Sequence, residues 1–248
     1  MGKSKRRSRR RSSDRAGWIV LGLVGLVAVV GGLTVAALTV NRAPSTVADV
    51  TKPSPAASAT STPAPAQRVA FLGDSWAGGT GADPSGPRNG YPGLTGSALG
   101  WEWKAFQGGG TGYTQGNDKG EGPFQSRVDA VVQYAPTVVV VQGSSNDLTS
   151  DFATVNAAAS EVFASLRAQL PNARIYALGA INSPASPASQ MDMVRSAVSA
   201  AASANGVTWI DGNAEGWLDV ATDFADGFHP NNQGHAKVAQ HLAAVLGG

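Results

Sequence analysis

The chain has 248 residues, of which 42% are hydrophobic and 15% charged, and this length allows one or two domains. Eight of the nineteen Lys and Arg residues lie in residues 1–17, whereas residues 68–248 hold nine basic and fifteen acidic residues. An acidic main part argues against a nucleic-acid-binding domain, which needs a basic face. The sequence contains no Cys, which excludes disulfides, thiolate metal sites and a Cys nucleophile.

The N-terminal segment has the pattern of a membrane anchor. Residues 18–40 are 23 residues without a charge, and a helix of that length, at about 1.5 Å per residue, spans the ~30 Å hydrocarbon core. Basic residues flank a span on its cytoplasmic side. We therefore predict a basic cytoplasmic tail (1–17) and a single-pass transmembrane signal-anchor helix (18–40). A cleaved signal peptide, giving a secreted protein, is the alternative, although its apolar stretch is usually shorter.

Residues 41–67 are rich in Pro, Ala, Ser and Thr and contain no aromatic residue. Such a segment buries too little apolar surface to offset its ordering entropy, so we predict a disordered linker between the membrane and the folded part. Residues 68–248 are then the folded domain, and we expect it on the extracytoplasmic side of the cell membrane.

Short apolar runs alternate with helical patterns along the folded part. Strands are expected at 68–72, 101–106, 137–141, 174–178 and 207–210, and helices at 126–134, 154–170, 187–204 and 233–246. This alternation predicts an α/β fold with a mostly parallel sheet covered on both faces. Sites in such sheets form beyond the carboxyl ends of the strands, which here are residues 73–81, 108–112, 143–147 and 223–229.

Two of these loops lie early in the folded part. Ser75, in Gly-Asp-Ser after the first strand, could present its hydroxyl outward, although the same three residues also form ordinary turns. Residues 108–113 read Gly-Gly-Gly-Thr-Gly-Tyr, which permits close approach of the backbone to a ligand or forms a flexible loop. A phosphate-binding loop is disfavoured because the Gly-Lys-Ser/Thr ending is missing.

The other two loops offer an amide and an Asp–His pair. Asn146, in Gly-Ser-Ser-Asn-Asp, could donate to a developing oxyanion or cap the next segment. Asp226 and His229 are three residues apart in Asp-Gly-Phe-His-Pro, so the carboxylate could orient the imidazole. The remaining histidines, His235 and His241, fall on different helix faces and are expected to be surface or capping residues. We expect no metal site and no cofactor.

These four segments, in this order, closely resemble the motifs of the GDSL-type, or SGNH, hydrolase family. The resemblance covers the chain from Val69 to the C-terminus. It implies a three-layer α/β/α sandwich with a five-stranded, flavodoxin-like sheet. It also implies that Ser75 is the nucleophile, His229 the general base and Asp226 the residue that orients it.

The resemblance further implies an oxyanion hole. Its donors would be the Ser75 N–H, the Asn146 side chain and a backbone N–H of the glycine block, with Gly112 favoured and Gly110 the alternative. Asp74 and Asp147 match positions that we interpret as holding loops. The chain departs from many members at 106–107, where Phe-Gln stands in place of an Asn.

A serine esterase acting through an acyl-serine intermediate is the function that this resemblance implies. We expect short acyl or acetyl esters as substrates, carried by cell-envelope polysaccharide or lipid. Trp76 and Tyr91, at or near the Gly- and Pro-rich loop 78–92, are candidate walls of the substrate site. The alternatives are a lipase or lysophospholipase of the same fold, an envelope O-acyltransferase, and an inactive binding module. The sequence does not indicate an oligomeric state.

Overall fold

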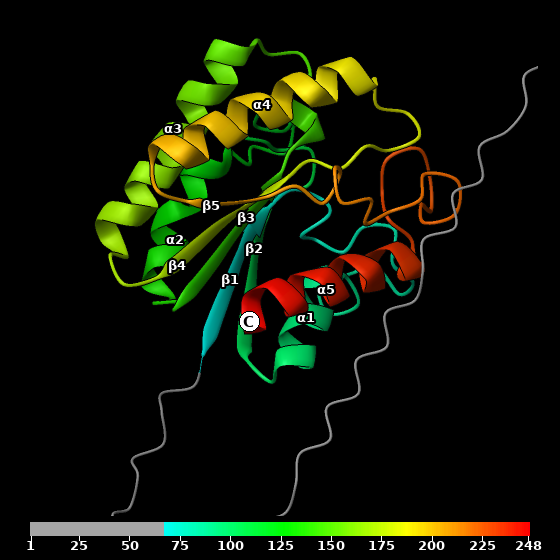
Figure 1. Ribbon diagram of the computed structural model, residues 1–248, viewed down its shortest axis with the longest axis horizontal. Coiled ribbons are helices and arrows are strands. Elements are labelled where there is room, and N and C mark those ends of the chain that lie inside the picture. The colour runs from blue at the N-terminus through cyan, green and yellow to red at the C-terminus, as the bar shows by residue number, and fades with distance from the viewer. Residues whose placement is uncertain (1–66) are drawn as a thin grey trace, which may run out of the picture. The chain divides into compact units, whose positions relative to one another are not determined.

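The computed structural model describes residues 67–248, which form an α/β unit around one parallel sheet (Figure 1). The sheet has five strands in the order β2-β1-β3-β4-β5, and every pairing is parallel. The strands are β1 (Arg68–Gly73), β2 (Glu102–Gln107), β3 (Val138–Gly143), β4 (Arg174–Gly179) and β5 (Thr208–Ile210). The predicted parallel sheet of five strands is confirmed.

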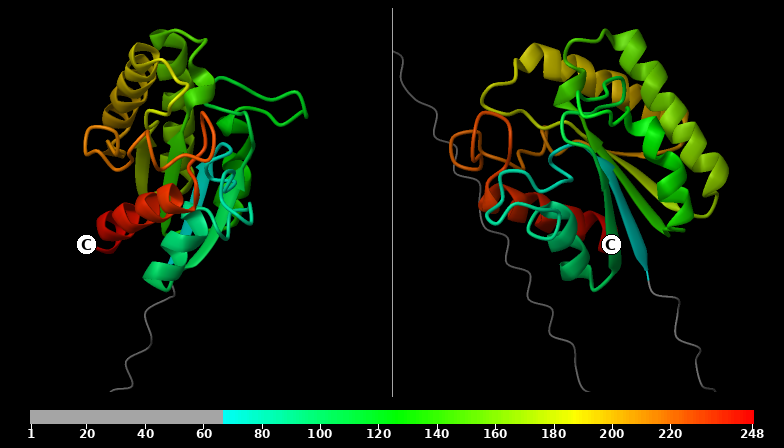
Figure 2. Two further views of the ribbon diagram at one scale, coloured as in Figure 1. Left: turned by 90° about the vertical axis from the view of Figure 1, so that its right-hand side faces the viewer. Right: turned by 180° about the vertical axis from the view of Figure 1, so that it is seen from behind.

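Helices cover both faces of the sheet, as the views in Figures 1 and 2 show. One face packs against α1 (Tyr91–Leu99) and α5 (Asn232–Gly247), which also lie against each other. The opposite face packs against α2 (Val128–Gln133), α3 (Phe152–Gln169) and α4 (Ala188–Ala204). Two 3-10 turns, η1 (Phe124–Arg127) and η2 (Ser145–Asp147), complete the elements.

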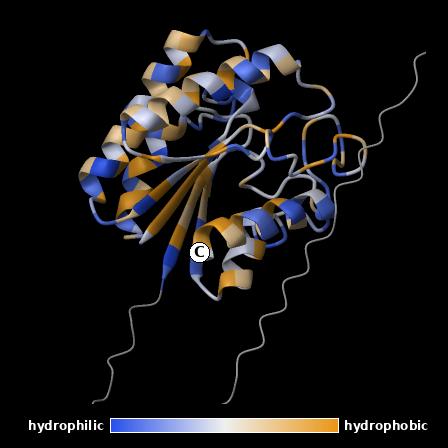
Figure 3. Ribbon diagram, in the orientation of Figure 1, coloured by the Kyte–Doolittle hydropathy of each residue, from blue (hydrophilic) through white to orange (hydrophobic). Residues whose placement is uncertain are grey.

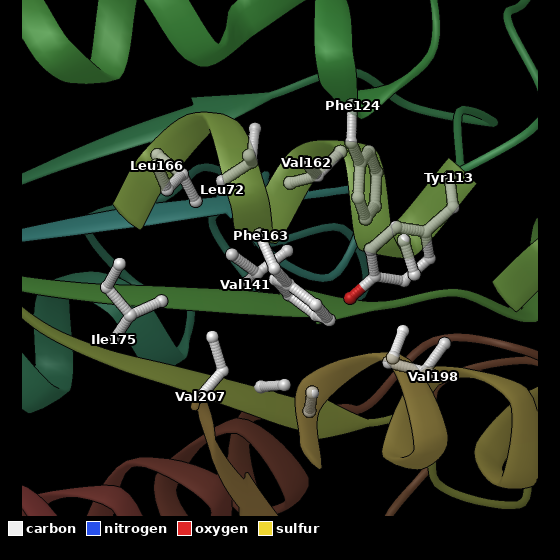
Figure 4. Close-up of a cluster of buried hydrophobic side chains, with 14 of the residues drawn as sticks. Leu72, Tyr113, Phe124, Val141, Val162, Phe163, Leu166, Ile175, Val198 and Val207 are labelled. Atoms are coloured by element: carbon white, nitrogen blue, oxygen red, sulfur yellow. The ribbon is translucent and has the colours of Figure 1, made fainter. Parts of the chain in front are cut away.

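The central strand β3 is buried along its whole length and supplies both halves of the core. Val138 and Val140 face α1 and α5, whereas Val139 and Val141 face α3 and α4. Figure 3 shows the strands as the most hydrophobic part of the fold, and Figure 4 shows Val141 among aromatic and aliphatic side chains from the sheet and from the helices and loops that cover one of its faces. Each buried Val stabilises the fold by about 1.5–3 kcal/mol relative to an exposed one, before entropy is counted.

Helix α1 was not predicted from the sequence, because its residues include Pro92, Gly93 and Gly96. The glycines serve close packing instead. A Cβ at Gly96 would lie 2.3 Å from the Trp103 ring, and one at Gly93 would lie 2.4 Å from the Arg88 carbonyl oxygen. The helix therefore forms because it fits against β2 and the preceding loop, and this packing overrides a weak propensity.

The helix predicted at 126–134 is divided into η1 and the shorter α2. The predicted transmembrane helix at 18–40 and nearly all of the predicted linker at 41–67 lie outside the described residues. Within residues 67–248, none of the helices combines the length and the apolar character that crossing a bilayer requires.

Candidate active site

The loops that follow β1, β2 and β3 meet at one end of the sheet. The chain leaves β1 for β2 on one side and reaches β3 on the other, so the gap between β1 and β3 is the point at which the strand order reverses. Ligand sites of open parallel sheets lie at such a point. Ser75 follows β1 by two residues and Asn146 follows β3 by three, which places both side chains at this end.

Ser75, His229 and Asp226 form a continuous hydrogen-bonded chain. The Ser75 hydroxyl lies 3.0 Å from His229 Nε2, and His229 Nδ1 lies 2.9 Å from Asp226 Oδ2. With the ring proton on Nδ1 donated to the carboxylate, Nε2 is left to accept the hydroxyl proton. The structure thus brings together the three residues that the sequence singled out as nucleophile, base and orienting acid.

The Asp226 carboxylate is fixed by the backbone that carries the histidine. Its Oδ1 accepts hydrogen bonds from the backbone N–H groups of Phe228, at 2.7 Å, and His229, at 2.8 Å. Partial burial acts to raise the pKa of Asp226, but the hydrogen bonds from the His229 ring and from these two N–H groups outweigh it, and the pKa is lowered. Asp226 is therefore ionised at neutral pH, as an orienting carboxylate must be.

Two buried aspartates join the three loops. Asp74 accepts hydrogen bonds from the Trp76 N–H, at 2.9 Å, and from the Ser144 hydroxyl, at 2.8 Å, which ties the loop after β1 to the loop after β3. Its burial raises the pKa to about 6. Asp147 accepts from the Tyr113 and Thr114 N–H groups, at 2.9 and 2.8 Å, which ties the loop after β3 to the loop after β2.

The structure separates the glycines of the block by role. The Gly112 N–H donates to the Gln115 carbonyl at 2.8 Å, and a Cβ at Gly112 would lie 2.5 Å from the Asp147 carboxylate. Gly112 is thus a packing position that does not line the cleft, contrary to the expectation from the resemblance. Gly109 and Gly110 line the cleft instead, beside Ser75.

Asn146 lines the same cleft. Its Nδ2 donates to the Thr111 carbonyl at 2.8 Å and to the Ser144 hydroxyl at 3.1 Å. These contacts place the amide nitrogen of Asn146, and not its amide oxygen, next to the glycine block. An Asn amide carries two N–H groups and both are partnered here, so donation to an anion in the cleft requires the amide to release the Ser144 hydroxyl.

The cleft has a volume of about 430 Å³ and a largely uncharged lining. It is lined by Ser75, Thr80, Gly109, Gly110, Ser145, Asn146, Phe228 and His229. Phe228 is half exposed and is the aromatic side chain of this lining. Sequence reasoning passed over Phe228, although its place directly before His229 was the available signal.

Neither expected aromatic wall lines the cleft. Trp76 is 6% exposed; its indole N–H donates to the Phe228 carbonyl at 3.0 Å and its ring packs edge-on against Phe224. Tyr91 is fully buried in the first turn of α1, with its hydroxyl toward Gln142. Of the loop 78–92, Thr80 lines the cleft, whereas Asp83 donates its N–H to the Asn232 side chain at the start of α5.

His235 is buried and links α1 to the cleft loop. Its Nδ1 accepts the Tyr91 N–H at 3.2 Å, and its Nε2 donates to the Thr80 carbonyl at 3.0 Å. Burial lowers the pKa of His235, so the ring is neutral. The expectation of a surface or capping role is wrong for this residue. His241 stacks on Trp217, with 4.8 Å between ring centroids. In residues 67–248, no three His, Asp or Glu side chains are grouped to hold a metal ion.

Residues 71–237 match the model of the GDSL-like lipase/acylhydrolase family. The chain belongs to this family. The family consists of carboxylic ester hydrolases, and the hydrogen-bonded Ser–His–Asp chain is the machinery that such a reaction needs. No curated protein sequence matches the chain.

Solved structures of esterases share the fold at low sequence identity. A carbohydrate esterase family 2 enzyme from Corynascus thermopiles (Myceliophthora fergusii) is 20% identical with a TM-score of 0.62; the match covers 75% of this chain and 67% of that one. The aryl esterase of M. smegmatis is 15% identical with a TM-score of 0.60, over 73% and 98% of the two chains. A carbohydrate acetylesterase from Sinorhizobium meliloti is 13% identical, with the same TM-score and coverage.

Proposed function

We propose that this family member is a serine esterase that removes short acyl groups, acetyl included, from neutral alcohols such as sugars. The observation that carries the proposal is the Ser75–His229–Asp226 chain at the edge of an open, uncharged cleft. The reaction needs a nucleophile, a base oriented to take its proton, and hydrogen-bond donors for the oxyanion. The lining of this cleft contains a candidate for each of these roles.

The chemistry proceeds in two halves. His229 Nε2 takes the Ser75 proton as the hydroxyl oxygen attacks the ester carbonyl, and the tetrahedral intermediate collapses as the imidazolium returns that proton to the leaving alcohol. The acyl group is then on Ser75. A water molecule gives its proton to His229 and attacks the acyl carbon, and Ser75 regains the proton as the acid departs. Asp226 stabilises the imidazolium in both halves.

The lining of the cleft supports a neutral substrate. Among the residues that line it, only His229 is titratable, so no Lys or Arg stands ready to pair with a phosphate or carboxylate group. Phe228 offers a half-exposed ring on which a sugar or aryl face can lie. A lysophospholipid would find no partner for its phosphate here. The solved relatives named for carbohydrate and aryl esters agree with this choice.

The proposal is tested by the turnover of p-nitrophenyl acetate, butyrate and octanoate, and of acetylated sugars, by the purified chain and its Ser75→Ala variant. We expect turnover of the acetate ester that the variant loses, and a rate that falls as the acyl chain lengthens. Hydrolysis that survives Ser75→Ala would refute the serine mechanism. A preference for octanoate would favour the lipase. Transfer of the acyl group to an added sugar, in place of water, would favour the acyltransferase.

We also propose that the domain acts outside the cell membrane, on esters of the cell envelope. The support is the uncharged segment 18–40 preceded by the basic residues 1–17. Protease added to intact cells should then remove the domain from membrane-bound protein. A domain that stays protected until the cells are lysed would refute this topology.

A further inference from the structure

The loop that follows the glycine block is organised around one side chain, that of Asn117. Its Oδ1 accepts hydrogen bonds from the Lys119 N–H, at 3.0 Å, and the Glu121 N–H, at 2.9 Å. Its Nδ2 donates to the Glu121 carboxylate, and the Asn117 backbone N–H donates to the Glu121 carbonyl at 2.9 Å. The loop is the green segment that projects from the fold in the left view of Figure 2.

Asn117 also reaches from this loop to the wall of the cleft. Its Nδ2 donates to the Gly109 carbonyl at 2.8 Å, and its Cβ lies 3.7 Å from the place that a Cβ on Gly110 would take. Gly109 and Gly110 are the glycines that line the cleft beside Ser75. The side chain therefore holds the peptide group between these two glycines from its outer side.

The direction of this peptide group follows from its planarity. The Gly109–Gly110 bond is not among the cis peptides of the described residues, and in a trans peptide the C=O and N–H bonds point in opposite directions. With the Gly109 carbonyl turned toward Asn117, the Gly110 N–H is turned away from the loop, to the cleft side. Within residues 67–248, neither the Gly109 nor the Gly110 N–H has a hydrogen-bond acceptor in the protein.

Such a peptide needs an external anchor. Gly110 has a φ of +77°, and glycine adopts positive and negative φ about equally well, so side chains within the block do not fix the orientation of this peptide. A flip would turn the Gly109 carbonyl toward the cleft, where an acceptor would repel a developing oxyanion.

We propose that Asn117 is a positioning residue for ester hydrolysis: by binding the Gly109 carbonyl it keeps the Gly110 N–H directed at the oxyanion. This inference rests on the proposed esterase function. It assigns the backbone donor to Gly110, with Asn146 and the Ser75 N–H as its partners. Removing one donor of an oxyanion hole typically lowers kcat about 10²–10³-fold.

The test exchanges the donor and the acceptor of the Asn117–Glu121 pair. Glu121→Gln alone keeps the Asn117 bonds and is the matched control. The double variant Asn117→Asp/Glu121→Gln keeps the net charge, the bond within the pair and the acceptor for the two loop N–H groups. It leaves no donor for the Gly109 carbonyl. We expect the double variant to lose at least about tenfold in kcat on p-nitrophenyl acetate, with KM changed less than twofold.

Active-site titration with a fluorophosphonate separates positioning from folding. A merely structural role would lower the number of titratable Ser75 sites and leave the rate per site unchanged, which would overturn the inference. The inference predicts a full count of sites, a melting temperature near that of the control, and a lower rate per site. If the double variant does not fold, Asn117→Ala in the Glu121→Gln background is measured in the same way. A wild-type chain that neither turns over esters nor labels at Ser75 overturns the proposed function itself, and this inference with it.

Discussion

Lys237→Met should destabilise the segment that carries Asp226 and His229. Asp223 is fully buried, and Lys237, on α5, donates to both of its carboxylate oxygens at 2.9 and 2.7 Å. The Asp219 N–H donates to the same carboxylate at 2.7 Å, and the Asp223 carbonyl accepts the Asn231 N–H. Asp223 therefore joins the two ends of residues 219–231, the segment that contains Asp226 and His229.

The expected cost follows from the burial of the carboxylate. Breaking a fully buried ion pair from one side costs about 3–5 kcal/mol. Lys237 is about one-third exposed, so part of its attraction is screened by solvent, and Asp223 keeps its backbone donor. We therefore expect a loss of about 2 kcal/mol in the free energy of unfolding, which for a domain of this size lowers the melting temperature by about 4–8 °C.

The pH dependence gives the sharper assay. Burial acts to raise the pKa of Asp223, but the bonds from Lys237 and the Asp219 N–H outweigh it and lower the pKa. The stability that the ionised group contributes is present above the unfolded pKa, near 4, and is lost as the pH falls through the lowered folded pKa. Lys237→Met removes most of this contribution, so thermal unfolding measured from pH 3 to 8 should show the full stability deficit of the variant near neutral pH, and the deficit should shrink as the pH falls below about 4. A variant that loses stability equally at every pH would refute the reasoning.

Three further predictions concern the site. Asp226→Asn should lower kcat on p-nitrophenyl acetate by about 10⁴-fold, because the amide no longer selects the productive tautomer of His229; a loss below tenfold would contradict this role. His235 has a pKa lowered by burial, so the wild type should lose stability as the pH falls below about 6.5, and His235→Gln should remove that part of the melting-temperature profile. Phe228→Ala should raise KM for aryl and sugar acetates several-fold and leave the turnover of ethyl acetate unchanged; an equal effect on all three esters would exclude a stacking role.

How far the sequence predicts this molecule depends on whether its signals are local. The run at 137–141 is β-branched throughout, so a buried central strand followed from composition alone, and β3 confirms it. Asp226 and His229 are three residues apart, so their pairing also followed from the chain. Helix α1 and the burial of Tyr91 depend on the Trp103 ring and on His235, which the local sequence does not reveal.

The glycine block shows the same limit within the site itself. Four glycines in five residues predict a backbone that approaches a ligand, but all of them permit this equally. A Cβ at Gly112 would meet the Asp147 carboxylate, whereas Gly109 lies beside Ser75 and its carbonyl accepts a hydrogen bond from Asn117. Motif matching favoured Gly112 because it compares residue types. The direction of each backbone N–H in the block depends instead on which group binds the carbonyl of the preceding residue.

The loops after β1, β2 and β3 are joined by two buried carboxylates, those of Asp74 and Asp147. Burying Asp74 and Asp147 is unfavourable, as the raised pKa of both carboxyls shows, and in each case burial is the largest cause. Their hydrogen bonds offset part of that cost, and they cross-link the loops after β1, β2 and β3. A nucleophile, an amide and a glycine peptide from three strands must keep their positions to within about 0.5 Å for the oxyanion to be bound. The hydrogen bonds of Asp74 and Asp147 serve that requirement, because each carboxylate binds groups from two of the three loops.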